Sequence, residues 1–320
     1  MPNFAAAPLA VARPAVRPSV RSPSRRAVAR RGPAFDPASA AYFDRVEADG
    51  GTVIDPPATD RLVRALKAAG AWDIGVAGFA TVGGAKLRDA SGTLYIAKDY
   101  SLFGAARDSA QSTDIRQPTW STAALNGWPV LHYPTTTDIW LRGGTVAPAE
   151  LLFVAVRRFL DPDNAGAGDY TISYADTGRA QLAADTYGWR IANYAGTASF
   201  TTRRPGQANA SSISAANDTD AWQIQTCIKI DGARSQRLQG SEVASDTQAG
   251  VIDYTNVGAT TYGRNQAGGG TALAPSLTSG FYGDRAAFLA FDVSGMNLAA
   301  CVAMAEAVEA AVDDIYAVLP

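Results

Sequence analysis

Apolar and polar residues alternate most regularly in the segment from Trp222 to Ile230. In steps of two, one face carries Trp222, Ile224, Thr226, Ile228 and Ile230, and the other carries Gln223, Gln225, Cys227 and Lys229. This period predicts a half-buried β-strand whose apolar face, with Trp222 at its start, points between two sheets. An Asp-Gly pair at 231–232 supplies a turn, and the polar segment 234–238 returns as the second strand of a hairpin.

Segments of strand character dominate the chain after Lys86. We predict strands at 93–98, 129–133, 138–142, 151–159, 169–175, 179–184, 188–194, 197–202, 221–230, 234–238, 250–253, 258–263 and 285–292. The segment 151–159 begins with an almost wholly apolar run, which is typical of a central core strand.

Three segments show apolar residues at helical spacing. The first, 37–49, ends at a Gly-Gly pair, and the second follows Asp55, which can cap it, with two prolines in its first turn. The third, 297–318, carries an apolar stripe. The first two helices are too short to bury their stripes alone, so we expect them to pack on the strands or on a neighbouring subunit.

The Trp-led strand, the Asp-Gly turn and the polar return strand resemble the signature hairpin of concanavalin A-like (laminin G-like) jelly rolls. Upstream, the segment 109–143 resembles the start of such domains in bacteriophage virion proteins, through Ala110, Gln111, Thr113, Gln117, Pro118, Asn126, Gly127, Pro129, Leu131 and Tyr133. Downstream, 282–319 resembles their end, an apolar strand followed by a C-terminal helix. The resemblance implies a mainly β fold, a concanavalin A-like jelly-roll β-sandwich at 85–320 with its C-terminal helix. Residues 35–84 resemble the helical lead-in found ahead of the sandwich in phage tail and other virion proteins.

Composition supports a β protein and distinguishes the N-terminal 34 residues from the rest of the chain. Charged residues make up only 18% of the 320 residues, and the formal net charge is −2. Residues 1–33 contain no acid and seven arginines, so the rest of the chain carries −9; the arginines are Arg13, Arg17, Arg21, Arg25, Arg26, Arg30 and Arg31. Prolines recur through this segment, so we expect residues 1–34 to form an extended, polyproline-like arm without a core of its own.

The resemblance and the arm together predict a structural protein of a phage or phage-like particle. The seven arginines would anchor the arm along other virion proteins, and the chain would form a homo-oligomer. A disordered tail and an organelle transit peptide share this composition. A nucleic-acid partner is disfavoured because no aromatic residue is interleaved with the arginines. The leading role is a tail fibre, head fibre or spike that presents a glycan-binding sandwich. The alternatives are a capsid decoration or baseplate protein with purely structural contacts, and a polysaccharide depolymerase or glucanase.

Sugar binding requires aromatic platforms beside amides or carboxylates. Two segments that look loop-rich offer them, and the candidate residues are Tyr187, Trp189, Asn193, Tyr254, Tyr262 and Asn265. A core or sheet-face position explains the same aromatic residues.

Catalytic patterns are weak, and we predict no enzyme. Glycoside hydrolases need two carboxyl groups at a fixed separation, and the five glutamates include no pair spaced along one strand. Glu306 and Glu309 share one face of the predicted C-terminal helix, where a solvated charge is the ordinary interpretation. His132 is the only histidine, and no serine or aspartate signature lies near it in the sequence.

No resident cofactor is expected, with calcium as a minor alternative. Asp161, Asp163 and Asp169 lie in a loop that could offer oxygen ligands, but their spacing matches no known calcium loop, and turn formation explains them equally well. Cys227 and Cys301 are too few for a disulfide framework, and we expect two separate small residues. No apolar run approaches the ~20 residues of a membrane span.

Overall fold

The computed structural model describes residues 34–134, 139, 141–144, 146–160, 169–176, 187–194, 197–202, 211–216, 220–252, 257–262 and 283–320. The predicted arm and the candidate strand 179–184 lie outside these ranges. Residues from Phe35 onward belong to one compact unit. The predicted fold class is confirmed, because the chain is mainly β, with one large antiparallel sheet folded into two facing layers and helices near both ends of the described part.

Three α-helices occur where the sequence predicts them. They are α1 (Pro37–Ala48), α2 (Pro56–Ala68) and α3 (Leu298–Tyr316). The carboxylate of Asp55 accepts a 2.8 Å hydrogen bond from an amide in the first turn of α2, and the side chain of Asn297 caps α3 in the same way at 2.9 Å. These caps satisfy backbone donors that have no partner inside a helix and so fix where each helix begins. Three short 3₁₀ helices lie at Trp72–Ile74, Ala105–Arg107 and Asp114–Arg116.

The strands form two facing layers and a flanking group, all antiparallel. The central layer contains β2 (Gly75–Ala80), β18 (Gly283–Asp292), β9 (Leu151–Phe159), β14 (Trp222–Ile230), β15 (Ala233–Leu238) and β16 (Ser241–Asp246) in that order. The facing layer contains β17 (Val257–Tyr262), β10 (Asp169–Asp176), β11 (Tyr187–Tyr194), β12 (Thr197–Thr202) and β13 (Ser211–Ala216). The flanking strands are β1 (Thr52–Val53), β3 (Gly84–Ala90), β4 (Thr93–Asp99), β5 (Ser109–Ala110), β6 (Thr119–Leu125), β7 (Trp128–Tyr133) and β8 (Leu141–Arg142).

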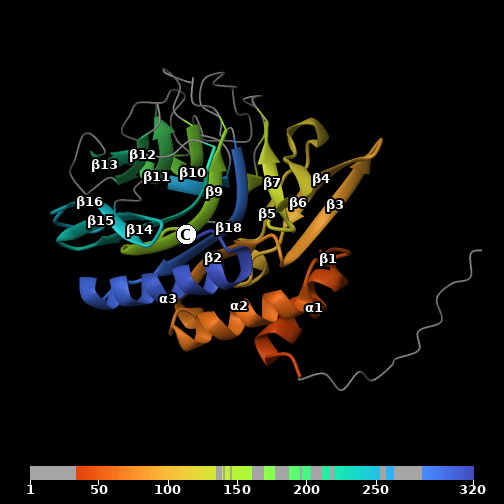
Figure 1. Ribbon diagram of the computed structural model, residues 1–320, viewed down its shortest axis with the longest axis horizontal. Helices are drawn as coiled ribbons and strands as arrows, with labels where there is room; N and C mark the ends of the chain where they lie inside the picture. Colours follow the sequence, from red (N-terminus) through yellow and green to blue (C-terminus); the bar gives the residue numbers. More distant parts are fainter. Residues whose placement is uncertain are drawn as a thin grey trace, which may run out of the picture. The chain divides into compact units, whose positions relative to one another are not determined.

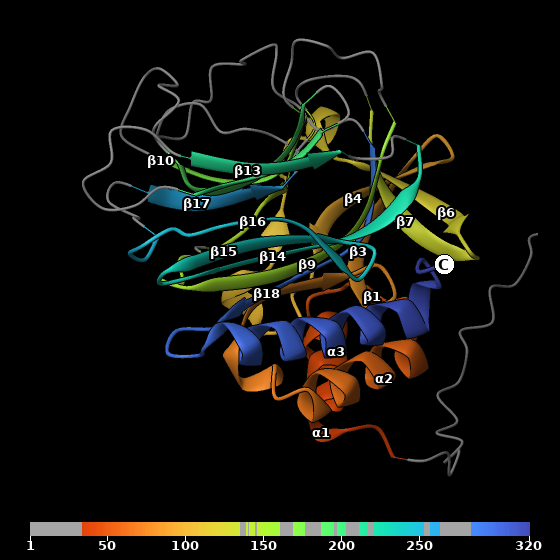
Figure 2. The same ribbon diagram turned by 60° about the vertical axis from the view of Figure 1, so that its left-hand side comes forward.

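The central layer is apolar on both faces, as β9 shows most clearly. Alternate residues of β9, such as Phe153, enter the core between the two β layers, where Trp189 of β11 also lies. The residues between them, such as Val154, enter a second core formed with the three helices. The molecule therefore has three levels, with the helices beneath the central layer and the facing sheet above it (Figures 1 and 2).

The hairpin β14–β15 has the predicted register, but its faces are reversed. Ile224 and Ile228 belong to the core beneath the helices, whereas Cys227 belongs to the core between the sheets. Trp222 is half-buried and packs on the helix-side core, so the prediction that it points between the sheets is wrong. The reason is that α3 covers the outer face of the central layer, which in a two-sheet sandwich would face solvent.

Polar side chains of the hairpin therefore lie inside the sandwich and are bonded there. Arg234 is fully buried and donates to both carboxylate oxygens of Asp246, at 3.1 and 2.6 Å, and to the Thr202 hydroxyl at 3.1 Å. Gln236 donates to the Ala198 carbonyl on the facing sheet at 3.2 Å. These contacts compensate the desolvation of the buried polar groups and tie the two layers together.

The lead-in and the sandwich are structurally continuous. The range 35–84 contains β2 in addition to the two helices, and β2 pairs with β18 in the central layer. Within the predicted strand 138–142, the described residues 141 and 142 form β8, and no strand forms at 250–252. Strands β1, β2, β3, β5, β6, β13 and β16 were not predicted. Strands β1 and β5 are only two residues long, and the others show no clear alternation of apolar and polar residues.

Two further side-chain expectations can be compared with the structure. Glu309 is 3% exposed and accepts a hydrogen bond from Arg237 Nε at 3.1 Å, so it is not the solvated charge expected for it, whereas Glu306 is exposed. Cys227 and Cys301 are free and buried in different cores, as predicted. No helix in the described ranges is long and apolar enough to cross a membrane.

Candidate functional site

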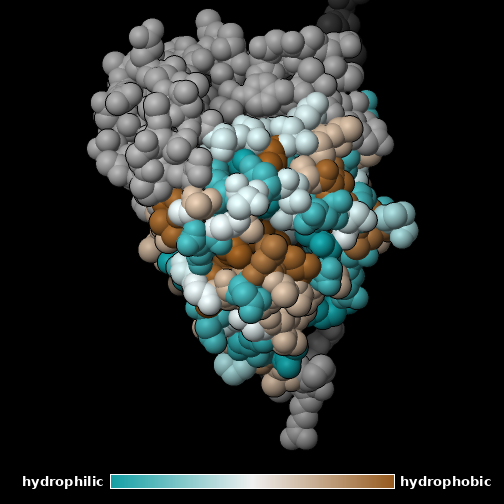
Figure 3. All heavy atoms as spheres, turned by 90° about the vertical axis from the view of Figure 1, so that its left-hand side faces the viewer, coloured by the Kyte–Doolittle hydropathy of each residue, from teal (hydrophilic) through white to brown (hydrophobic). Residues whose placement is uncertain are grey.

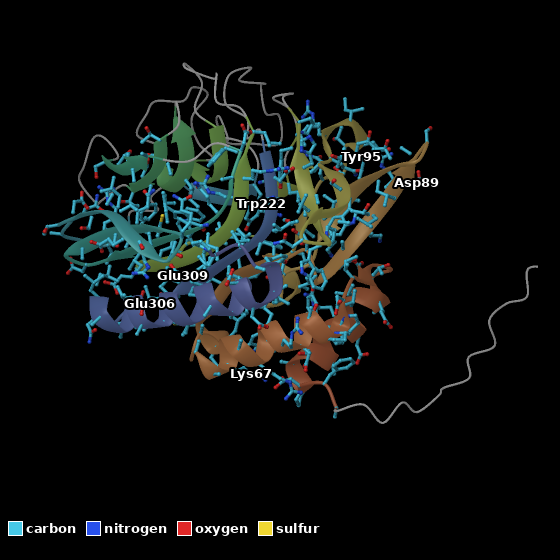
Figure 4. The ribbon with its side chains drawn as sticks, in the orientation of Figure 1. Lys67, Asp89, Tyr95, Trp222, Glu306 and Glu309 are labelled. Atoms are coloured by element: carbon cyan, nitrogen blue, oxygen red, sulfur yellow. The ribbon has the colours of Figure 1, made fainter. Side chains whose placement is uncertain are left out.

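A row of side chains crosses the outer face of the sheet at the edge of the helix layer. Directly paired residues on neighbouring strands place their side chains on the same face. The pairing runs through six strands, from Tyr95 on β4 through Thr119, His132, Asp284 and Arg158 to Trp222 on β14. We call these six residues the cross-strand ladder; Tyr95 and Trp222 mark its two ends in Figure 4.

Asp284 is the centre of the ladder. Its side chain is 3% exposed, and one carboxylate oxygen lies 2.8 Å from His132 Nδ1. The other oxygen accepts two hydrogen bonds from Arg158, from Nε at 3.0 Å and from Nη2 at 2.5 Å. The guanidinium of Arg158 also lies over the ring of Trp222, 5.3 Å from its centroid. The carboxylate thus orients a histidine and an arginine that are each about 30% exposed.

A hollow of about 550 Å³ opens over this part of the ladder. Its lining is rich in hydroxyl groups and consists of Gly92, Thr93, Leu94, Thr119, Trp120, Ser121, Thr122, Ala124, His132, Arg158, Leu160 and Asp284. Strand β6 bulges here, because its pairing with β7 shifts register between Ser121 and Leu125. Ala123 in the bulge has a φ of 56°, a left-handed conformation that is strained for alanine. The bulge brings Ser121 and Thr122 to the wall of the hollow.

The chemistry of the hollow suits a polyhydroxylated ligand. Arg158 supplies charged donors, and the hydroxyls of Thr93, Thr119 and Ser121 can donate or accept. His132 adds an imidazole whose orientation is fixed by Asp284. A histidine oriented by a carboxylate is also the arrangement of a general base. The His132–Asp284 pair therefore also has the geometry that hydrolysis would require.

The ladder could not be found from the sequence. His132 has no aspartate near it in the chain, but strand pairing brings Asp284 to it from 152 positions away. Arg158 and Trp222 come from two further strands. Only the strand order brings these residues together, and that order cannot be read from local patterns.

The predicted sugar platforms are not brought together. Trp189 and Tyr262 are 0% exposed, so the prediction that they stack on a sugar is wrong. Trp189 donates from Nε1 to the Val146 carbonyl at 3.2 Å, and its ring stacks on Phe288 at 6.3 Å. Both residues lie in strands, β11 and β17, that agree with the strands predicted at 188–194 and 258–263, but both side chains are buried.

The other predicted site residues remain predictions. Tyr187 and Asn193 lie on β11, but the structure does not describe their side chains. Tyr254, Asn265 and the seven arginines of the arm lie outside the described ranges. Asp161 and Asp163 also lie outside them, and Asp169 is the first residue of β10. Within the described ranges, no cluster of three or more His, Cys, Asp or Glu side chains could hold a metal.

Several glutamates have structural partners. Both carboxylate oxygens of Glu150 accept backbone amides, from Asp231 at 2.7 Å and from Gly295 at 2.9 Å. Glu242 accepts from the hydroxyl of Ser235 at 2.8 Å. These bonds occupy carboxylates that would otherwise be candidates for acid–base chemistry.

A buried ion pair lies behind the ladder. Arg285 follows Asp284 and points to the opposite face, where its Nη2 lies 2.7 Å from Asp99 Oδ2. Both side chains are at most 5% exposed, and the guanidinium also lies over the rings of Phe79 and Tyr262, at 5.6 and 5.2 Å from the centroids. Burial raises the pKa of Asp99 to about 7, although the charge of Arg285 acts to lower it.

No protein-family model matches the sequence, and no curated protein matches it. Solved structures give distant fold matches. The CBM40 of the Ruminococcus gnavus IT-sialidase bound to alpha2,3 sialyllactose is 12% identical, with a TM-score of 0.39 over 49% of this chain and 82% of that one. The botulinum neurotoxin serotype D binding domain is 8% identical, with a TM-score of 0.45 over 76% of this chain and 52% of that one. The NanB sialidase from Streptococcus pneumoniae is 12% identical, with a TM-score of 0.37 over 48% of this chain and 24% of that one. The chain thus spans about a quarter of the NanB sialidase and about half of the neurotoxin chain.

Proposed function

We propose that this chain is a non-enzymatic glycan-binding protein that binds a sugar in the hollow over the cross-strand ladder. The observation that carries the proposal is the Asp284-centred network, which holds Arg158 and His132 in place at the wall of a 550 Å³ hollow lined with hydroxyls. Ligand sites of this kind combine a concave surface with a few polar groups fixed in orientation before binding. A single shallow site of this kind binds weakly, so useful adhesion requires several copies presented together.

The particle role completes the proposal. The resemblance to phage virion proteins and the arginine-rich arm support a fibre or spike component of a phage or phage-like particle, assembled as a homo-oligomer. On the side of the molecule that carries β16, apolar side chains gather in the middle of the surface with polar ones around them (Figure 3), and such a surface suits packing against another subunit.

Replacing Arg158 by alanine is expected to weaken glycan retention by at least about tenfold, since a hydrogen bond to a charged group contributes roughly 1.5 to 3 kcal/mol. The assay is an array of defined glycans probed with the purified protein. Arg61→Ala is the matched control, because Arg61 is 57% exposed on α2 and its ion pair with Asp314 spans 3.7 Å. Its binding should equal that of the wild type.

Two outcomes would contradict the proposal. If the wild type retains no glycan on the array, the hollow is not a sugar site. If mass spectrometry shows that a bound oligosaccharide is shortened, and His132→Ala stops the shortening, the chain is a hydrolase of the depolymerase type. The His132–Asp284 pair is the observation that favours this second function.

Deleting residues 1–33 is expected to leave a folded protein that no longer joins particles. The described core begins at α1, and seven arginines in a proline-rich segment can pair with an acidic partner surface but cannot fold alone. Thermal unfolding tests the first part, and incorporation into particles tests the second. Normal incorporation of the truncated chain would show that the arm is not an anchor.

A further inference from the structure

A second hollow lies beside the first and shares a wall with it. Its volume is about 450 Å³, and its lining includes Tyr95, Arg88, Ile115, Gln117 and Pro134. Thr119 lines both hollows. Since Tyr95 pairs with Thr119 and Thr119 pairs with His132, Tyr95 is two strand spacings, about 10 Å, from His132.

Tyr95 in this second hollow has a fixed orientation. The guanidinium of Arg88 lies over its ring, 4.7 Å from the centroid. Arg88 is held in turn by Gln117, which accepts a hydrogen bond from Nε at 2.9 Å, and by the Asp114 carbonyl, which accepts one from Nη2 at 3.2 Å. The half-buried ring of Tyr95 is thus oriented without a ligand, and little conformational entropy remains to be lost when one binds.

The two hollows differ in chemistry in a way that matches a sugar chain. The first is bordered by Arg158, His132 and several hydroxyls, which suit the hydroxyl groups of a sugar. The second joins an aromatic ring to the exposed side chain of Ile115, which is 82% exposed, and to Pro134. Sugar rings have an apolar C–H face, and an aromatic ring beside polar groups is a suitable surface for it.

We propose that the two hollows are consecutive subsites for one oligosaccharide. One sugar unit is bound over His132 and Arg158, and the next packs its apolar face on Tyr95, with Thr119 between them. This inference rests on the proposed function, because the second hollow is taken to hold the next unit of the same sugar chain that the first hollow binds. The preferred ligand is therefore a chain of linked sugars and not a single terminal sugar.

The test uses the full-length protein and an array on which each glycan is printed as a single sugar and as successively longer oligomers. For the wild type, we expect retention to rise by about tenfold, equivalent to about 1.4 kcal/mol, when a second unit is added. Tyr95→Ala should abolish that gain between one unit and two, whereas Tyr95→Phe should keep it. Arg158→Ala should weaken retention of every length.

Two further variants separate a lost subsite from a damaged fold. Ile115→Asp changes the rim of the second hollow at a highly exposed position, so it should keep the wild-type melting temperature and lose part of the length dependence. Arg61→Ala on α2 is the control at an exposed position away from both hollows, and its binding should equal that of the wild type.

The possible failures are distinguishable. If glycans bind but retention does not depend on length, or if Tyr95→Ala and Ile115→Asp keep the dependence, the two-subsite inference is wrong and the proposed function stands. If no glycan of any length is retained, both are wrong.

Discussion

The Arg285→Met variant is expected to lose unfolding free energy above pH 7, by up to about 1.4 kcal/mol for each pH unit, because Asp99 either ionises in a buried site without its cation or stays protonated at that cost. The two groups lie 2.7 Å apart, and both are almost completely buried. Methionine replaces part of the packing against Phe79 and Tyr262, so most of the loss comes from the uncompensated charge. Urea unfolding of the purified variant measures the change directly.

The loss should grow with pH. Because burial raises the pKa of Asp99 from 3.8 to about 7 in the folded protein, protonated Asp99 favours the fold, and this contribution is lost as the pH rises through 7. In the variant, Arg285 no longer lowers the pKa of Asp99, so the unfolding free energy continues to fall at higher pH. The difference in stability between wild type and variant should therefore increase between about pH 7 and pH 9, above the ordinary range of a carboxyl group.

Arg61→Met is the matched control for this measurement. Arg61 and Asp314 are more than half exposed, and exposed ion pairs contribute about 0 to 1 kcal/mol. Equal losses from the two substitutions, or a loss from Arg285→Met that does not change with pH, would show that the buried pair does not act as described.

The Trp189→Ala variant is expected to lose about 3 to 5 kcal/mol through the cavity that it leaves between the two sheets. Trp189 is 0% exposed, and its ring stacks on Phe153 at 5.9 Å and on Phe288 at 6.3 Å. The variant also loses the hydrogen bond that Trp189 Nε1 donates to the Val146 carbonyl. Thermal and urea unfolding measure the loss.

Glycan retention separates this core role from a role in binding. At a temperature where the Trp189→Ala variant stays folded, retention per folded molecule should equal that of the wild type. Trp189→Phe, which keeps an aromatic ring in the core, should lose less stability than the alanine variant. A variant with wild-type stability and weakened retention would return Trp189 to the set of sugar-binding residues.

Local patterns predicted much of the secondary structure and little of its environment. Asp55 indicated the start of α2, the apolar stripe at 297–318 indicated α3, and the apolar run at 151–159 is β9. These predictions succeeded because caps and periodicity are properties of neighbouring residues. Alternation in β14 showed that its two faces differ, but not that a helix covers the apolar one.

The candidate site was beyond local patterns for the same reason. The strand at 188–194 was predicted, but Trp189 was placed among the sugar platforms because local composition does not show that its side chain is buried between the two layers. His132 and Asp284 are joined only through the pairing of β7 with β18. A prediction of the ladder would require the strand order of the whole sheet.

The position of β18 determines when the chain can fold. This strand, at residues 283–292, lies between β2 and β9 and also pairs with β7, so the middle of the central layer is completed only after the other strands of the described part have been synthesised. Until then, β9 lacks its neighbour on one side, and the apolar faces that β9 and β14 turn toward the helices are not covered by α3. Late, long-range pairing of this kind is slow and leaves apolar strands open to association with other nascent chains. We therefore expect the chain to be prone to aggregation until β18 has paired and α3 has packed on the central layer.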